Sequence, residues 1–153
     1  MHIQGLVHMN INCSDFERSR EFYEKLGFEV YLEIPERNTP EVAAAVGFEK
    51  YEIRGALMRL RGGRSPFVID LLEWREPNDS SPPYSGLNHI GIARIAMASS
   101  DLDADLAELR DRGIEIIGEP ATVIWADRPS SRFVCFKDPD GTVLELVQDL
   151  SSA

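Results

Sequence analysis

Hydrophobic and polar positions alternate over the first residues of the chain and then change to a helical period. The alternating, partly β-branched run LVHMNINC (6–13) predicts a strand. Ser14 and Glu17 match a capping box, so we expect a helix over 15–26. Gly27 follows directly and is expected to end that helix as a C-cap glycine.

The same half of the chain contains three more strand-like runs and one short helical run. The segment TPEVAAAV predicts a helix over 39–46, with Thr39 as N-cap and Pro40 as the first helical residue. The runs FEVYLEI, ALMRLRGG and FVIDLLEW predict strands over 28–34, 56–63 and 67–74. Gly62 and Gly63, at the end of the run 56–63, indicate a hairpin connection to the run 67–74.

The second half begins after a stretch rich in Pro, Ser, Asn and Asp, EPNDSSPPYSG, which predicts a linker over 76–86. The apolar run LNHIGIARIAM predicts a strand over 87–97. A leucine stripe predicts a helix over 101–112 that ends at Gly113. Four further apolar runs predict strands over 114–118, 122–126, 132–138 and 142–148.

The two halves resemble each other as an internal repeat. HMNI in the first half corresponds to HIGI in the second, and VIDLL corresponds to VLELV. The repeat aligns His8 with His89 and Asp70 with Glu145, and each half reads as a β-α-β-β-β unit. This pattern predicts an α+β domain. Its expected parts are a first module over 1–75, a linker over 76–86 and a second module over 87–150.

The two histidines and two of the acids carry the candidate chemistry. If the first and last strands of a module are neighbours, His8 can meet Asp70, and His89 can meet Glu145. Two imidazoles and two carboxylates suit a divalent first-row metal ion, with water in the remaining positions. Each residue taken singly is more simply a core or surface side chain, so the metal hypothesis depends on the matched pairs.

The strand FVIDLLEW raises a second question, because it contains two acids, Asp70 and Glu73. Burying a carboxylate costs several kcal/mol unless it is paired, hydrogen-bonded or bound to a metal. Side chains alternate between the two faces of a strand, so Glu73 is expected to point away from the face of Asp70. We therefore expect Asp70 to face the site.

Composition limits the partners of the protein. The 153 residues carry a formal net charge of −10, which argues against nucleic acid or an anionic membrane as partner. No apolar run is as long as a membrane span, and no signal-peptide pattern is present, so a cytoplasmic protein is expected. The two cysteines, Cys13 and Cys135, are interpreted as reduced buried thiols.

With these segments in view, the sequence resembles the vicinal oxygen chelate superfamily. The superfamily includes glyoxalase I, extradiol dioxygenases and metal-free bleomycin-resistance proteins. The resemblance covers nearly the whole chain and rests on VHMNINCSDFERSREFYEKLGFEV, FVIDLLEW, NHIGI and FKDPDGTVLELV. It implies paired βαβββ modules that form a curled mixed sheet around a cleft. It also implies a small-molecule substrate and a homodimer.

The resemblance implies a ligand set and a reaction type. The four metal positions of the family fall on His8, Asp70, His89 and Glu145, for one divalent ion of Ni, Zn, Co, Mn or Fe. A glyoxalase-like enzyme, an isomerase or lyase, would use Glu145 as general base to move a proton on a small α-oxygenated carbonyl substrate. Asn12 stands where glyoxalase I carries an arginine for glutathione, so glutathione is not the expected substrate.

Two other interpretations stay open. Asp70 is one methylene shorter than the usual family Glu, and without it His8, His89 and Glu145 form the two-His-one-carboxylate set of an Fe(II) extradiol-type dioxygenase. The other alternative is a binding protein of the bleomycin-resistance kind, which needs no metal.

Several aromatic and basic residues are candidates for substrate contacts. For any one of them, a core Trp or a solvated surface Arg is the simpler interpretation. The segment WADRPSSR resembles a family loop that flanks the site, which favours its two arginines. The candidates are Arg59, Trp74, Trp125, Arg128 and Arg132.

Overall fold

The structure is a computed structural model that describes residues 2, 4–36, 39–63, 67–126 and 130–151. It divides into two compact units, Met1–Ser81 and Pro82–Ala153, and the boundary falls inside the expected linker 76–86. Each unit has its own four-stranded mixed sheet. The α+β class and the glyoxalase-like module order predicted from the sequence are confirmed.

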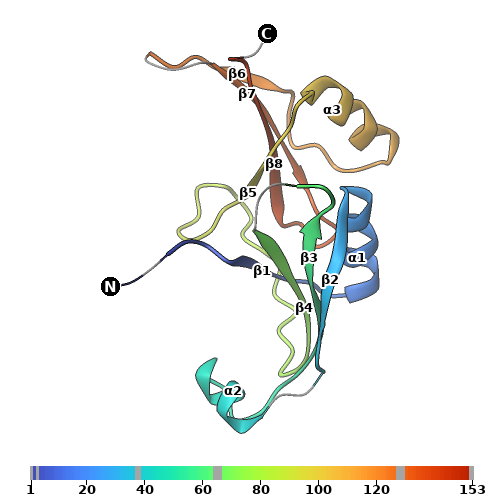
Figure 1. The fold of residues 1–153 in the computed structure, drawn as a ribbon. Helices are drawn as coiled ribbons and strands as arrows, with labels where there is room; N and C mark the ends of the chain where they lie inside the picture. Colours follow the sequence, from blue (N-terminus) through green and yellow to red (C-terminus); the bar gives the residue numbers. More distant parts are fainter. Residues whose placement is uncertain (1, 3, 37–38, 64–66, 127–129, 152–153) are drawn as a thin grey trace. The chain divides into compact units, whose positions relative to one another are not determined.

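The first unit orders its strands β1-β4-β3-β2 (Figure 1). β1 runs parallel to β4, and the other neighbouring strands are antiparallel. Helix α1 covers one face of this sheet, while α2 lies beyond the ends of the strands (Figure 1). The elements are β1 (His8–Asn12), α1 (Phe16–Lys25), β2 (Phe28–Ile34), α2 (Pro40–Ala45), β3 (Glu52–Leu60) and β4 (Val68–Glu76).

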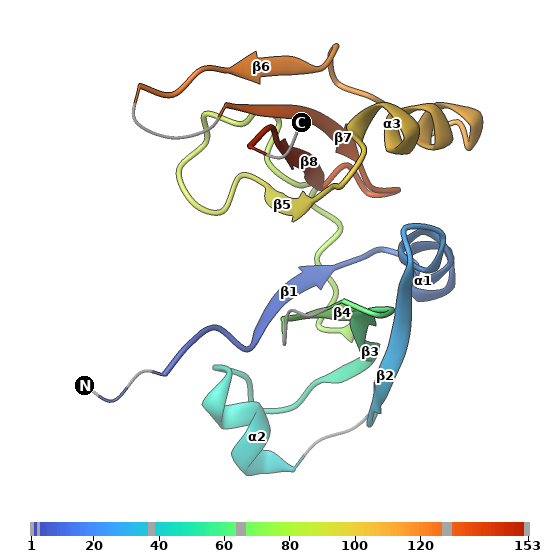
Figure 2. The same cartoon turned by 45° about the horizontal axis from the view of Figure 1, so that its top comes forward.

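The second unit repeats this topology, and its described residues contain no counterpart of α2. Its strand order is β5-β8-β7-β6, with β5 parallel to β8 and helix α3 beside the sheet (Figure 2). Leu102 and Leu106 of the helix pack with Val134 in its buried core. The elements are β5 (Ile95–Ala98), α3 (Leu102–Asp111), β6 (Ala121–Val123), β7 (Ser131–Lys137) and β8 (Val143–Asp149).

Three strands of the second unit are shorter than the sequence predicts. The run 87–97 forms a strand only at Ile95–Ala98, because Gly91 adopts a φ of 119°, which an extended strand does not contain. The run 114–118 contributes one isolated bridge, from Ile116 to Phe136, and β6 ends at Val123. An apolar pattern alone therefore overestimates strand length in this half.

Helices α1 and α3 each begin one residue later than the sequence pattern predicts, and both begin after an aspartate N-cap. Asp15, not Ser14, is the N-cap of α1, and its carboxylate accepts from the Arg18 amide at 3.0 Å. Asp101 does the same for α3, accepting from the Ala104 amide at 3.1 Å. A short acidic side chain at this position satisfies a backbone N–H that has no partner within the helix.

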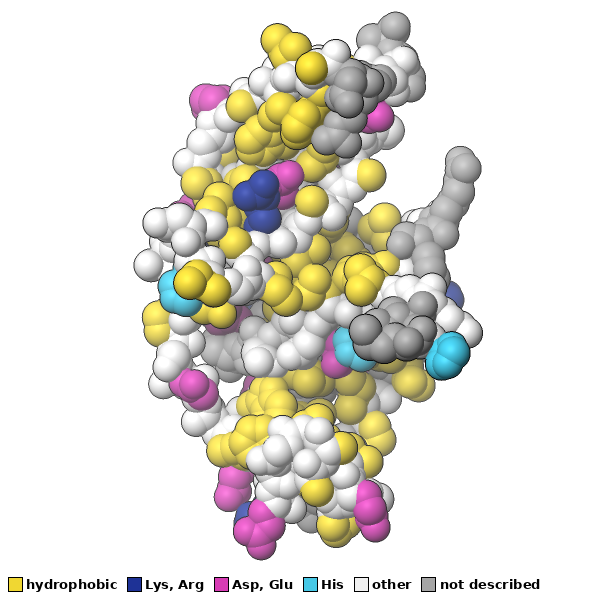
Figure 3. All heavy atoms as spheres, turned by 90° about the vertical axis from the view of Figure 1, so that its left-hand side faces the viewer, with side chains coloured by type: hydrophobic (Ala, Val, Ile, Leu, Met, Phe, Trp, Pro, Cys, Tyr) yellow, Lys and Arg dark blue, Asp and Glu magenta, His cyan; other side chains and the backbone are white. Residues whose placement is uncertain are grey.

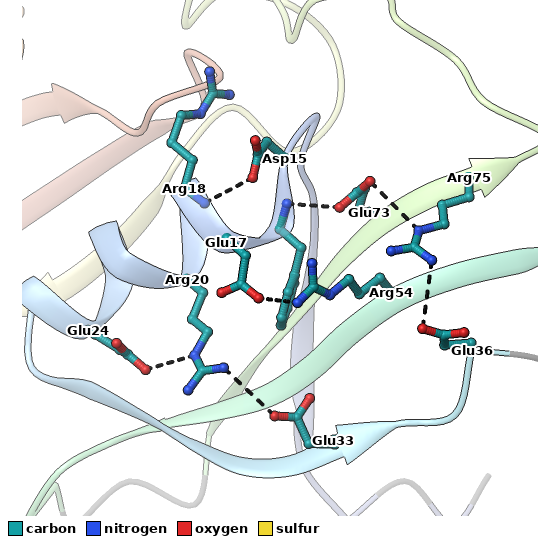
Figure 4. A network of polar contacts seen from close by, with 11 residues as sticks. Asp15, Glu17, Arg18, Arg20, Glu24, Glu33, Glu36, Arg54, Glu73 and Arg75 are labelled. Carbon is teal, nitrogen blue, oxygen red and sulfur yellow. Dashed lines mark hydrogen bonds and ion pairs between the residues drawn. The ribbon is translucent and has the colours of Figure 1, made fainter.

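The last strand of each unit supplies a second acceptor to the start of the helix. The amide of Phe16 donates to Glu73 Oε2 at 3.0 Å, within the polar network around α1, β3 and β4 in Figure 4. In the second unit the amide of Leu102 donates to Gln148 Oε1 at 3.2 Å. Glu73 therefore faces the helix, as the strand alternation predicted. Asp70, three residues earlier in β4, faces the other side of the sheet.

The second acceptor at the start of α1 can be tested by mutation, and Gln148 of the second unit suggests the control substitution. We expect Glu73→Ala to lower the free energy of unfolding by about 1 kcal/mol, because an amide at the helix start loses its acceptor. Glu73→Gln keeps the acceptor that the second unit uses naturally, so it should retain most of the stability. Chemical denaturation of the three proteins measures this difference. Equal losses in both variants would contradict the hydrogen-bond explanation.

Candidate functional site

We call the sheet face opposite the helix the open face of each unit. In the first unit the register pairs Asn10 with Asp70, and His8 lies two residues before Asn10 on the same side of β1. His8 Nε2 lies 3.9 Å from Asp70 Oδ2, and the two side chains are 48% and 16% exposed. The open face thus brings together the histidine and the acid that the sequence analysis selected in this half.

The carboxylate of Asp70 is not fully compensated by its surroundings. Within the described part of the chain, its buried Oδ1 atom has no hydrogen-bond partner. Burial raises the pKa of Asp70, and the nearby His8 lowers it by a smaller amount. An acid of this kind is more easily protonated than a surface aspartate, and an unpaired buried oxygen has the capacity to accept from a ligand.

An aromatic group stands farther along the same strand. Trp74 lies four residues after Asp70 in β4, and its indole N–H donates to Asn12 Oδ1 at 3.0 Å. The Trp74 ring centroid lies 5.1 Å from the ring centroids of both Phe48 and Tyr51. Trp74 is therefore held by one hydrogen bond and two ring contacts.

Arg59 is already engaged with its neighbours. Its Nε donates to Glu29 Oε1 at 2.9 Å, and its guanidinium carbon lies 5.2 Å from the ring centroid of Tyr31. The pKa of Glu29 is lowered by the hydrogen bonds from Arg59 and Arg61. Arg59 therefore forms part of a surface ion-pair cluster at the β2–β3 edge of the sheet.

A surface cavity of about 310 Å³ lies elsewhere in the first unit. It is not lined by His8 or Asp70. Lys50 and Glu76 on its wall form an ion pair at 3.8 Å. The cavity is lined by Thr39, Pro40, Ala43, Glu49, Lys50, Tyr51, Glu52 and Glu76.

The second unit has a different pair on its open face. The register pairs Ala96 with Glu145, and Arg94 lies two residues before Ala96, as His8 lies two before Asn10. Arg94 Nε forms an ion pair with Glu145 Oε2. Glu145 is 7% exposed, so the guanidinium provides the opposite charge that a buried carboxylate requires.

A thiol completes the surroundings of this carboxylate. Cys135 pairs with Glu145 in the β7–β8 register, and its Sγ donates to Glu145 Oε2 at 3.6 Å. Burial raises the pKa of the Cys135 thiol, and the negative charge of Glu145 raises it further. Cys135 therefore stays protonated at neutral pH and acts as a hydrogen-bond donor.

His89 lies in the segment before β5 and not in the strand. Its ring stacks on Tyr84 with centroids 3.9 Å apart, and its Nδ1 lies 2.8 Å from the carbonyl oxygen of Ile90. The register places Arg94, rather than His89, at the position that His8 occupies in the first unit. The repeat alignment of His8 with His89 is therefore wrong in register.

The spacing between Arg94 and the N-cap of the next helix is a sequence signal for its position, although Arg94 and His8 are different residue types. Asp15 follows His8 by seven positions, and Asp101 follows Arg94 by the same distance, and these two acids are the helix N-caps. Counting back from the helix start aligns the two modules correctly. Matching histidine to histidine does not.

The remaining substrate-contact candidates of the second unit are not brought together at one site in the described residues. Arg132 makes a bidentate ion pair with Asp103 of α3, at 2.9 and 3.0 Å, which places it on the helix side. This pair lowers the pKa of Asp103. Trp125 donates from its indole nitrogen to Ser131 Oγ at 3.2 Å. Arg128 lies outside the described residues.

The metal hypothesis can be compared with these contacts. The first unit offers a histidine and a partly compensated carboxylate, which fit a divalent ion. The second unit offers a carboxylate already paired with a guanidinium, which does not fit one. Over the described ranges, no group of three or more His, Cys, Asp or Glu side chains is arranged to hold a metal ion.

Comparisons with known proteins agree with this fold. The Glyoxalase/Bleomycin resistance protein/Dioxygenase superfamily model matches residues 5–146. The YwkD protein of Bacillus subtilis (strain 168) is 30% identical over 154 residues, which cover 97% of this chain and 99% of YwkD. The chain therefore belongs to the Glyoxalase/Bleomycin resistance protein/Dioxygenase superfamily, as the sequence resemblance predicted.

Solved structures with this fold include proteins of different roles. A glyoxalase family protein from Bacillus cereus has a TM-score of 0.75 and 19% identity, with 99% of both chains covered. TnmS3, an antibiotic-binding protein from Streptomyces sp. CB03234, has a TM-score of 0.62 and 25% identity, covering 97% of this chain and 98% of its own.

In the described part of the chain, none of the helices has the length and apolar character needed to cross a membrane.

The partly compensated carboxylate of Asp70 should affect stability. A raised pKa means that the ionised form is disfavoured in the folded state, so its cost appears as the pH rises above the usual aspartate value. We expect Asp70→Asn to raise the free energy of unfolding at pH 7 by about 1 kcal/mol, and the gain should disappear towards pH 3. Denaturation across this pH range measures it. A gain that is independent of pH would contradict the ionisation argument.

The Arg94–Glu145 pair predicts a strong coupling between two substitutions. Arg94→Ala should cost about 3 kcal/mol of folding stability, because it leaves a buried carboxylate without its counter-charge. Adding Glu145→Gln should recover most of that loss, since no charge is then buried. A double-mutant cycle by chemical denaturation tests this. Additive effects would show that the pair is not coupled.

Proposed function

We propose that the protein is a small-molecule-binding member of its superfamily that uses the open faces of its sheets without a resident metal ion. The observation that carries this proposal is Arg94, which occupies the register position of His8 and is paired with Glu145. The proposal adopts the binding-protein alternative among the interpretations of the sequence. The fold similarity to the antibiotic-binding protein TnmS3 supports it.

Electrostatics favours this alternative. Two unit charges 4 Å apart interact by about 4 kcal/mol at the effective dielectric constant near a protein surface, so a guanidinium and a divalent ion would repel by about 8 kcal/mol. This repulsion would offset a large part of the attraction between the ion and the Glu145 carboxylate. Glu145 is therefore better suited to hold Arg94 than to bind a metal ion.

The second candidate is the metal-dependent glyoxalase-like enzyme with His8, Asp70, His89 and Glu145 as ligands. The observation that favours it is the unpartnered Oδ1 of Asp70 beside His8, a pair that could bind a cation. A bound metal would stabilise negative charge on a substrate oxygen, while Glu145 would serve as the base. With Fe(II) and three of these ligands, the same residues would define a dioxygenase. This candidate requires Glu145 to leave Arg94.

We also propose a homodimer, as the family resemblance implies, and a cytoplasmic location, as the sequence pattern led us to expect. Leu6 and Val7 are 82% and 71% exposed, and they precede β1, an edge strand of its sheet. Exposed apolar residues next to a strand edge favour association with a second chain. The molecular mass in solution tests this part of the proposal.

Metal content distinguishes the two candidate functions. The parent protein, incubated with Ni, Zn, Co, Mn or Fe(II) and desalted, is expected to retain no stoichiometric metal. Arg94→His removes the cation and supplies an imidazole at the same register position, so it should retain more metal than the parent. Elemental analysis measures both.

The opposite result is equally defined. One equivalent of metal in the parent, weakened tenfold or more by Asp70→Ala, would establish the metal-dependent enzyme instead. Lys137→Gln is the matched control for Arg94→His. It also removes a positive charge, but Lys137 is paired with Glu115 at 2.6 Å and not with Glu145.

A further inference from the structure

On the open face of the second unit, the guanidinium of Arg94 is held by one ion pair that involves only its Nε. Arg94 contacts Glu145 through Nε, and its side chain remains 44% exposed. Among the described residues, no other ion pair or hydrogen bond of Arg94 is found. A guanidinium carries five N–H donors in a rigid fork, so the pair leaves the terminal nitrogens available.

Glu145 fixes the orientation of that fork. The carboxylate is buried between the strands β5 and β7, where Cys135 also donates to it. Its position is therefore set by the sheet and not by a flexible surface side chain. An arginine held at Nε by a fixed carboxylate is preorganised, so less conformational entropy is lost when it binds a ligand.

Apart from Glu145 and Lys137, the side chains named here on the open face around Arg94 are apolar. Ala96 and Ala98 of β5 are exposed and leave space above the strand. Phe133 and Val147 are register partners on the same face and are partly exposed. Lys137 shares the face, but Glu115 already binds its ammonium group. In the upper part of Figure 3, a basic and an acidic side chain stand together among hydrophobic side chains.

We propose that Arg94 is the recognition residue for a small organic monoanion with a flat apolar body, such as an aromatic carboxylate. The two oxygens of a carboxylate match the free edge of the guanidinium, and the apolar body fits beside the alanines, Phe133 and Val147. Glu145 is the positioning residue. This inference rests on the proposed function, because it names the ligand class of the metal-free binding face.

Charge decides between a monoanion and a polyanion. The chain has a formal net charge of −10, so its field repels multiply charged ligands such as nucleotides. A single carboxylate places one negative charge opposite a cation that is shared with Glu145. The hydrophobic contact of the ligand body then supplies the remaining binding free energy.

The experiment compares 1-naphthoate with its neutral amide, 1-naphthamide, as probes of the same shape. Titrations followed by amide chemical shifts of the labelled full chain give the affinity and the location of each probe. We expect naphthoate to bind the parent at least about tenfold more tightly than naphthamide, with shifts concentrated on β5, β7 and β8.

The variants separate recognition from folding. Arg94→Gln alone leaves Glu145 buried without its counter-charge, so the test uses the Arg94→Gln/Glu145→Gln double variant, which buries no charge. This variant should bind the two probes equally. Arg94→Lys keeps the charge but lacks the fork, so it should retain only part of the preference. The control is Arg110→Gln, whose arginine is paired with Glu119 on the surface and should not affect binding.

The outcomes are distinct from those of the metal measurement. Equal binding of the two probes by the parent, binding of neither probe, or a preference that survives in the double variant would each overturn this inference. A metal-free parent with any of these results would retain the proposed binding function but not its anionic ligand. Stoichiometric metal in the parent would instead overturn the proposed function itself.

Discussion

The parallel pairing of the first and last strands of each unit is the constraint on which the other features depend. It fixes which residue of β1 lies beside Asp70 and which residue of β5 lies beside Glu145. Because side chains alternate along a strand, the same pairing also sends Glu73 and Gln148 towards the helices. One backbone arrangement thus determines both the start of each helix and the chemistry of each open face.

The two units keep the structural part of this arrangement and differ in the chemical part. Both begin their helix with an aspartate N-cap and a second acceptor from the last strand. The open faces carry different pairs, an imidazole near a partly compensated carboxylate in the first unit and a guanidinium on a buried carboxylate in the second. Folding requires acceptors at the helix starts, whereas neither helix start depends on the residues of the open face, which can therefore differ between the units.

Much of the fold could be predicted from the sequence, because caps, glycines and apolar periods are local signals. The α+β class, the module order and the opposite orientation of Asp70 and Glu73 follow from such signals. The partner of Glu145 could not be found in this way. The repeat HMNI/HIGI favours His89, whereas strand β5 begins only at Ile95, after Gly91 with its φ of 119°. Register is a property of strand pairing, and a match of residue types does not determine it. The ion pairs of Arg59 and Arg132 were missed for a similar reason, since their partners are distant in the sequence.

The place of Arg94 in the register also has a consequence for how this family of proteins can change. Two of the arginine codons differ from the histidine codons by a single base, so one nucleotide substitution can exchange a guanidinium for an imidazole at such a position. Glu145 is retained in either case and meets a cation or a metal ligand without any change in the strands. On this scaffold, an open face with a guanidinium–carboxylate pair and one with an imidazole–carboxylate pair can therefore be separated by a point mutation and not by a rearrangement of the fold.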